Sequence, residues 1–188
     1  MFDSHAQGAL IAAHWHVWLL SFILVAAAVI DGWKLKVPNW ITFPLVISGW
    51  VYGAACFGWP GLGASLLGTA VGLGLLLPAY AIGGMGAGDV KLLGGVGAWV
   101  GATATFYAFC VSALAGGLIA LAMVAYRRRW QHHQVQFMSI LTEILTVRDP
   151  NALAAIAAER KSSMLLLPYG IPIALGTIGY FVWAGMLL

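Results

Sequence analysis

Two aspartates, Asp31 and Asp89, each lie at the edge of a long apolar run in a chain that has only six acidic residues. A carboxylate in that position is costly to desolvate and needs a structural or chemical reason. Two carboxylates held close together in a poorly solvated site cannot both ionise easily and tend to share one proton. The ionised member can then take a proton from water while the protonated member polarises a peptide carbonyl. Such a pair could hydrolyse a peptide bond without a metal or a covalent intermediate.

The sequence leaves two other interpretations of these acids open. They are 58 positions apart, so only folding can bring them together. Asp31 could simply reach the membrane interface, and Asp89 could cap the helix that follows it and offset its dipole. A proton- or ion-coupled transporter would also place acids beside glycines in the membrane. Against a transporter, the chain shows no inverted repeat, and both acids are expected near one membrane face rather than at the midplane.

The composition points to the class of protein that must position these acids. Of the 188 residues, 62% are hydrophobic and only 8% are charged, whereas a soluble domain carries about 25% charged residues. A water-soluble protein is therefore excluded, and an all-α integral membrane protein is expected. Residues 1–7 contain no Lys or Arg, so they lack the basic region of a cleavable signal peptide, and the first apolar run is expected to be retained as a helix.

The apolar runs predict about six transmembrane helices, because crossing the hydrocarbon core takes about 20 apolar residues. The expected spans within one membrane domain, 1–188, are residues 12–30, 40–57, 62–82, 90–102, 105–126 and 164–188. Residues 59–61 read as a turn, and the uncharged run 92–126 is too long for one span, so we divide it at residues 101–105. Pro38 suits the start of the second helix. Gly68 and Gly72, four apart in the third, permit close helix contact.

The basic residues predict how the chain is oriented. If the first span enters from outside, all nine Lys and Arg residues fall on the inner, cytoplasmic face, where such residues are enriched. They are Lys34, Lys36, Lys91, Arg127, Arg128, Arg129, Arg148, Arg160 and Lys161. Asp31 and Asp89 then lie at that same face. Residues 130–163, the only long polar stretch, carry apolar residues at helical spacing and are expected to form a cytoplasmic amphipathic segment on the membrane surface.

Three short motifs occur in order along the chain. Residues 31–39 read Asp-Gly-Trp-Lys-Leu-Lys-Val-Pro-Asn, residues 86–92 read Gly-Ala-Gly-Asp-Val-Lys-Leu, and residues 167–174 read Leu-Pro-Tyr-Gly-Ile-Pro-Ile-Ala. They resemble the first aspartate motif, the Gly-x-Gly-Asp motif and the Pro-aromatic-Gly element of the bacterial type IV prepilin peptidases, a family of GxGD aspartic proteases. Each motif alone is weak, but the three together, in the right order on about six spans, cover nearly the whole chain.

This resemblance implies an aspartic endopeptidase that removes the short basic leader of prepilins and pseudopilins at the cytoplasmic face of the bacterial inner membrane. It implies that Asp31 and Asp89 are the catalytic pair and that Gly86 and Gly88 shape the loop around the second of them. Lys91 could belong to the site or could anchor the chain at the interface.

The other two motifs contribute further candidates. Pro38 and Asn39 close the first motif and are expected to help shape the site. Tyr169 and Gly170, at the broken start of the last span, could line a substrate groove, although a tyrosine there could equally be an interface anchor. The implied partners are the prepilin substrates and the lipid bilayer.

The chain departs from the larger members of that family in its cysteines. Those members carry a cytoplasmic module with paired CxxC motifs that methylates the new amino terminus, whereas Cys56 and Cys110 stand alone in separate apolar runs. Methylation by this chain is therefore not expected. The short length of the chain and the sequence Gly-Met-Gly-Ala-Gly-Asp at residues 84–89 resemble the peptidases of tight-adherence (Flp/Tad-type) pilus systems.

Other functions find less support in the sequence. The glycine-rich loop follows an apolar run rather than a strand and lacks Gly-Lys-Ser/Thr, so a nucleotide site is not expected. His14 and His16, like His132 and His133, are more simply explained as interface or solvent-exposed side chains than as metal ligands. No cofactor, metal or nucleic acid is expected. The alternatives to a peptidase are a small coupled transporter or a non-catalytic membrane component of a pilus or secretion apparatus.

Overall fold

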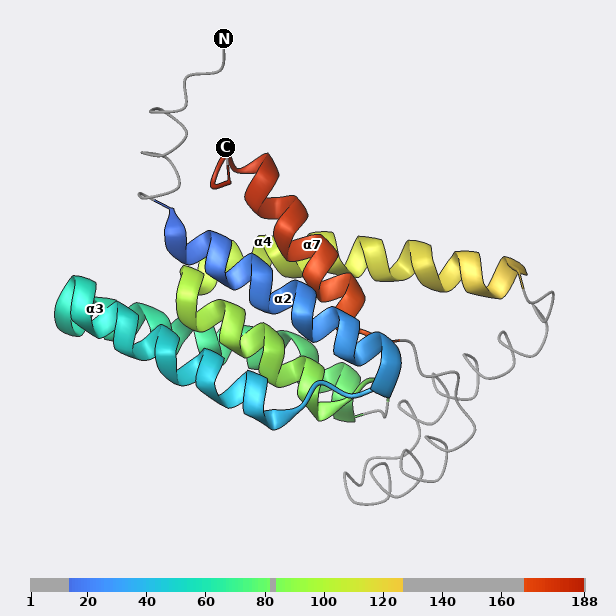
Figure 1. Cartoon of the computed structure of the whole chain (residues 1–188), viewed down its shortest axis with the longest axis horizontal. Coiled ribbons are helices and arrows are strands. Elements are labelled where there is room, and N and C mark those ends of the chain that lie inside the picture. The colour runs from blue at the N-terminus through green and yellow to red at the C-terminus, as the bar shows by residue number, and fades with distance from the viewer. Residues whose placement is uncertain (1–13, 82–83, 127–167, 188) are drawn as a thin grey trace, which may run out of the picture.

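The computed structural model describes residues 14–81, 84–126 and 168–187, and this part of the chain is helical with no β-strand (Figure 1). The helices are α2 (Trp15–Lys34), α3 (Asn39–Ala81), α4 (Ala87–Tyr126) and α7 (Gly170–Trp183). The expected all-α class is confirmed. The predicted amphipathic segment 130–163 and the start of the last predicted span, 164–167, lie outside the described residues.

Three of these helices, α2, α3 and α4, are long and apolar enough to cross a membrane. Their most apolar windows have mean hydropathies of 1.8, 1.8 and 2.0, and α7 is a shorter apolar helix of 14 residues. Large apolar side chains also point outward, such as Phe22 and Trp33, which are 74% and 84% exposed. An apolar exterior of this kind suits lipid rather than water. The protein is therefore an integral membrane protein by fold, and the count of six spans stays a prediction.

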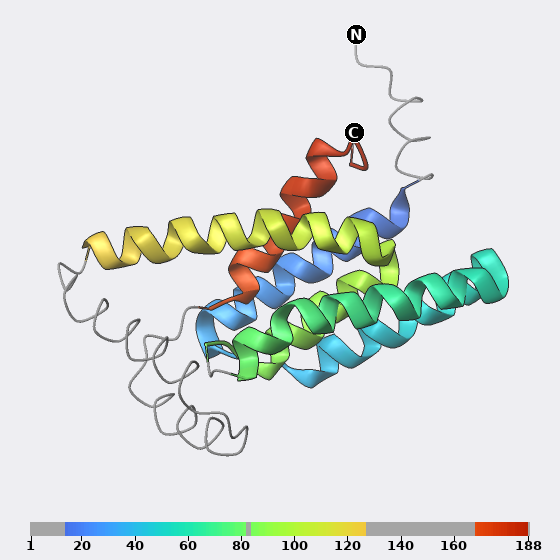
Figure 2. The ribbon, with the colours of Figure 1, turned by 180° about the vertical axis from the view of Figure 1, so that it is seen from behind.

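Two long helices are broken at glycines. Gly58 in α3 has φ 65° and ψ −149°, and Gly101 in α4 has φ 77° and ψ 175°, conformations that favour glycine because it has no Cβ. At Gly58 the chain turns back, so the two arms of α3 lie side by side in both views (Figures 1 and 2). These breaks coincide with the expected divisions near residues 59–61 and 101–105.

The ends of two helices differ from the predicted spans. α2 continues to Lys34 rather than stopping at residue 30, so Asp31 lies in its last turn and not beyond it. Leu35 then ends the helix with a left-handed φ of 50°, and its N–H donates to the Asp31 carbonyl at 2.7 Å. α4 begins at Ala87 rather than at residue 90, which places Asp89 in its first turn.

Glycines hold α3 and α4 at close range. A Cβ on Gly68 would overlap the carbonyl oxygen of Gly97, and a Cβ on Gly72 would overlap that of Leu93. The predicted close contact through Gly68 and Gly72 is thus confirmed. α4 packs most extensively against α3 and next against α7, while α2 packs mainly against α7. α4 therefore lies at the centre of the helix packing.

The two ends of α2 meet different surroundings. Near its first turn, the ring of His16 stacks on Tyr52 of α3, which stacks in turn on Trp99 of α4, with centroid separations of 5.4 and 5.1 Å. Its last turn instead meets the start of α7, and the loop that follows meets the start of α4. The C-terminal end of α2 and the first turns of α3, α4 and α7 thus gather at one end of the molecule (Figure 1).

Candidate active site

Asp31 is buried in the last turn of α2, with 2% of its surface exposed. Its Oδ2 accepts a hydrogen bond of 2.7 Å from the backbone N–H of Gly170, the first residue of α7. The first N–H groups of a helix have no partner within the helix and attract negative charge. A Cβ on Gly170 would lie 2.9 Å from both Cβ and Oδ2 of Asp31, so only glycine permits this approach.

Asp89 is also buried, with 5% of its surface exposed, in the first turn of α4. Its Oδ2 accepts a 3.1 Å hydrogen bond from the N–H of Gly86, and its own N–H donates to the Gly86 carbonyl at 3.2 Å. This reciprocal pair closes the glycine-rich turn and fixes the direction of the carboxyl. The carboxylate lies where the α4 dipole favours negative charge, so the capping role considered from the sequence is present in the fold.

The start of α7 lies against Asp31. Tyr169 immediately precedes Gly170, the residue that donates to Asp31. Asp31 is in the last turn of α2 and Asp89 is in the first turn of α4. The loop that follows α2 packs against the first turn of α4, so the two acids lie at the same end of the described helices.

Gly88 brings the loop after α2 against the start of α4. A Cβ on Gly88 would lie 2.5 Å from the carbonyl oxygen of Val37 and 3.0 Å from its Cβ. Val37 is buried and precedes Pro38, whose carbonyl accepts the N–H of Ile41 in the first turn of α3. Sequence analysis did not single out Val37. The sequence signal that could have pointed to Val37 is its place in the first motif, between Asp31 and Pro38-Asn39.

Lys91 and Asn39, both predicted as residues that shape the site, are in contact. The Lys91 Nζ donates to the Asn39 Oδ1 at 3.1 Å and lies 4.6 Å from the centre of the Phe43 ring. A cation over an aromatic face is favourable. This contact ties the first turn of α3 to the start of α4, two residues after Asp89 in the sequence.

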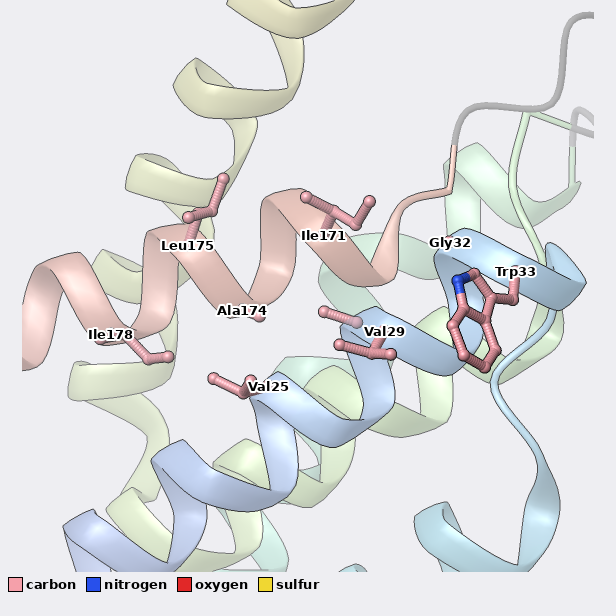
Figure 3. Close-up of a pocket in the computed structure, with 9 residues that line it drawn as sticks. Val25, Val29, Gly32, Trp33, Ile171, Ala174, Leu175 and Ile178 are labelled. Atoms are coloured by element: carbon pink, nitrogen blue, oxygen red, sulfur yellow. The ribbon is translucent and has the colours of Figure 1, made fainter.

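An open groove of about 440 Å³ lies between α2 and α7 (Figure 3). Its lining consists of Val25, Ala28, Val29, Gly32, Trp33, Ile171, Ala174, Leu175 and Ile178. Tyr169 and Gly170, considered from the sequence for a substrate groove, do not line it, because Gly170 is turned toward Asp31. One end of the groove is instead lined by Gly32 of α2 and Ile171 of α7, the residues that follow Asp31 and Gly170.

The described residues hold no group of three His, Cys, Asp or Glu side chains placed to bind a metal ion. His14 and His16 have ring centres 6.3 Å apart, and the Nδ1 of His16 lies 3.5 Å from the hydroxyl of Tyr52. His132 and His133 lie outside the described residues.

The chain is similar to known proteins over more than half of its length. The model of a family described as the type IV leader peptidase family matches residues 18–121, which is more than half of the chain and contains both aspartates. The prepilin leader peptidase/N-methyltransferases of Aeromonas hydrophila and Aeromonas salmonicida are each 31% identical to it over 126 residues, covering 63% of this chain and 43% of theirs. The chain thus spans less than half the length of these curated relatives. No solved structure matches it.

Proposed function

The chain belongs to the type IV leader peptidase family, and we propose that it cleaves the basic leader from prepilins and pseudopilins with Asp31 and Asp89 as the catalytic pair. The observation that carries the proposal is that two buried acids lie at the same end of the described helices, Asp31 in the last turn of α2 and Asp89 in the first turn of α4, where Gly88 packs against Val37 of the loop that follows α2. Two buried acids of different helices at one end of the fold suit acid–base chemistry better than two separate interface roles.

In the proposed reaction the two carboxyls share one proton. The ionised carboxylate removes a proton from a water molecule as its oxygen attacks the scissile carbonyl carbon, while the protonated carboxyl hydrogen-bonds to the carbonyl oxygen. The tetrahedral intermediate collapses when the leaving nitrogen receives a proton, which yields a new carboxyl and a new amine. The hydrogen bond from Gly170 keeps the Asp31 carboxyl oriented through these steps.

We further propose that the site faces the cytoplasm at the inner membrane of a bacterium. Support comes from Lys34, Lys36 and Lys91, which lie in the same elements and loop as the two acids, since basic residues are enriched on the cytoplasmic side. The two acidic residues that the structure describes lie in the last turn of α2 and the first turn of α4, with these lysines. This arrangement gives no acid along the middle of the described helices, where a coupled transporter would need one.

The substrate class that we propose is the Flp-type prepilins, because residues 84–89 resemble those of tight-adherence peptidases. The proposal covers only the peptidase part of the relatives' name. The described site is built from carboxyls and backbone amides, which are suited to hydrolysis.

The test is cleavage by the purified protein in lipid nanodiscs. A Flp-type prepilin incubated with it should lose its leader in a single cut, read by intact mass, and added EDTA should leave the rate unchanged. The matched control carries both Asp31→Asn and Asp89→Asn and should leave the substrate intact. Cleavage by this double variant, or cleavage abolished by EDTA, would show that another group performs the reaction.

A further inference from the structure

One end of the groove between α2 and α7 is adjacent to the Asp31 site. Gly32 follows Asp31 in α2, and Ile171 follows Gly170 in α7, and both line this end of the groove, which Asp31 and Gly170 do not line. A Cβ on Gly32 would lie 3.6 Å from the Cδ1 of Ile171, so the two helices are in van der Waals range there. A segment that occupied the groove would therefore end one residue along each helix from Asp31 and Gly170.

The shape of the groove suits a helix. α2 lines it with residues 25, 28, 29 and 32, and α7 with residues 171, 174, 175 and 178, the i, i+3, i+4, i+7 spacing with which helices pack. These positions span about two helical turns, or about 10 Å, along each helix. Figure 3 shows Val25 and Val29 pointing from α2 toward α7.

The lining determines which partner the groove can hold. Ala28, Gly32 and Ala174 are small and leave room for a helix backbone to approach. Val29 and Leu175, which are 51% and 56% exposed, rise on opposite walls. Every lining residue is apolar, aromatic or glycine, so a basic leader would be desolvated there without a partner. The apolar part of a substrate fits, and its charged part does not.

We propose that this groove binds the apolar transmembrane helix of the prepilin substrate and so places the scissile bond at Asp31. The inference rests on the proposed function, since it names the substrate segment that the peptidase site would use. A helix docked in the groove, with its end beside Gly32 and Ile171, delivers the peptide bond just beyond its apolar segment to the two carboxyls. The position of cleavage is then set by where the apolar segment begins.

Photo-crosslinking tests which partner occupies the groove. Benzoyl-phenylalanine is placed at Val29 or at Leu175 in an Asp89→Asn background, which retains uncleaved substrate, with Leu67 of α3, 60% exposed and outside the groove, as the control position. Irradiation with a Flp-type prepilin should give an enzyme–prepilin adduct from positions 29 and 175 and not from position 67. Adducts only to lipid, or only to a second copy of the chain, would overturn the proposal.

Kinetics of otherwise wild-type protein provide the second test. Val29→Trp and Leu175→Trp should each raise KM for the prepilin about tenfold with kcat little changed, while Leu67→Trp, on an exposed position of α3 outside the groove, should change neither. Deleting the apolar segment of the substrate should raise KM as well, and the two losses should not add when combined, because they remove the same contact.

The outcomes separate this inference from the function on which it rests. If wild-type protein cleaves the prepilin and both tryptophan variants have an unchanged KM, the groove proposal is wrong and the peptidase assignment stands. If wild-type protein cleaves no prepilin, the proposed function fails and the groove assignment fails with it.

Discussion

Gly170 is the residue on which the position of the Asp31 carboxyl depends most directly. Its N–H donates to Oδ2 at 2.7 Å, and its missing side chain leaves the space that the carboxyl occupies. Hydrogen bonds to an ionised acceptor are among the stronger ones in proteins. We therefore expect a change at Gly170 to act on the proposed catalysis through the position of Asp31.

We predict that Gly170→Ala lowers the cleavage rate by about 10- to 100-fold, because the new Cβ would push the Asp31 carboxyl away from the position that the reaction needs. The overpacking should also destabilise the fold by about 1–3 kcal/mol. Cleavage kinetics and thermal unfolding in detergent measure the two effects.

The matched control is Gly179→Ala in the same helix. A Cβ there would meet only the Cγ1 of Val111 at 3.9 Å, which is an ordinary contact. Equal activities of the two alanine variants would argue against the role of Gly170 in orienting Asp31.

At this scale the sequence predicts the acids and the glycines around them, but not the contacts between them. Asp31, Asp89, Gly86 and Gly88 can be recognised from residue type and motif. The bond from Gly170 to Asp31 joins residues 139 positions apart and depends on how α7 packs. Such a contact is a property of tertiary structure and has no local pattern in the sequence.

At the scale of the elements, the packing of α3 against α4 supports the site. The pairing relies on backbone approach at Gly68 and Gly97, where neither residue has room for a methyl group. In a bilayer, small residues of this kind permit the close packing that drives helix association. Because α4 also carries Asp89, a shift between these helices would move the second acid.

We predict that Gly68→Ala destabilises the protein by about 1–3 kcal/mol, since its Cβ would overlap the carbonyl oxygen of Gly97. Gly74→Ala is the control in the same helix, because a Cβ there has no heavy atom within 4 Å. Thermal unfolding followed by tryptophan fluorescence should show a lower midpoint for the first variant only. Indistinguishable midpoints would mean that the α3–α4 approach contributes little.

The elements themselves are largely predictable, and their ends are less so. The sequence indicates the breaks near Gly58 and Gly101 through the Trp-Pro-Gly turn at residues 59–61 and through the uncharged run 92–126, which is too long for one membrane crossing. The extension of α2 through Asp31 was not foreseen. A charged residue normally ends an apolar span, and here the carboxyl is accommodated because α7 supplies a donor.

At the scale of the whole molecule, the account requires a definite orientation in the membrane. Lys36 lies in the loop between α2 and α3, while Trp59 follows the break of α3 at Gly58. Figure 1 shows the turn of α3 far from that loop. The distribution of basic residues predicts that the first is cytoplasmic and the second external.

We predict opposite labelling of these two positions in a background with Cys56→Ser and Cys110→Ser. Lys36→Cys should react with a membrane-impermeant maleimide only in inverted vesicles, and Trp59→Cys only in intact spheroplasts. Denatured samples of both variants provide the control for total reactive thiol. The reverse pattern would place the two aspartates outside the cell and exclude a cytoplasmic active site.

The central claim is that Asp31 and Asp89 together cleave the prepilin leader, and one measurement tests it most directly. A Flp-type prepilin is co-expressed with wild-type protein, Asp31→Asn or Asp89→Asn at matched membrane levels, and its intact mass is determined. We expect loss of the leader with wild type and at least about 100-fold less cleavage with either variant, because each substitution removes an acid–base group. Full cleavage by either asparagine variant would contradict the paired-carboxyl mechanism.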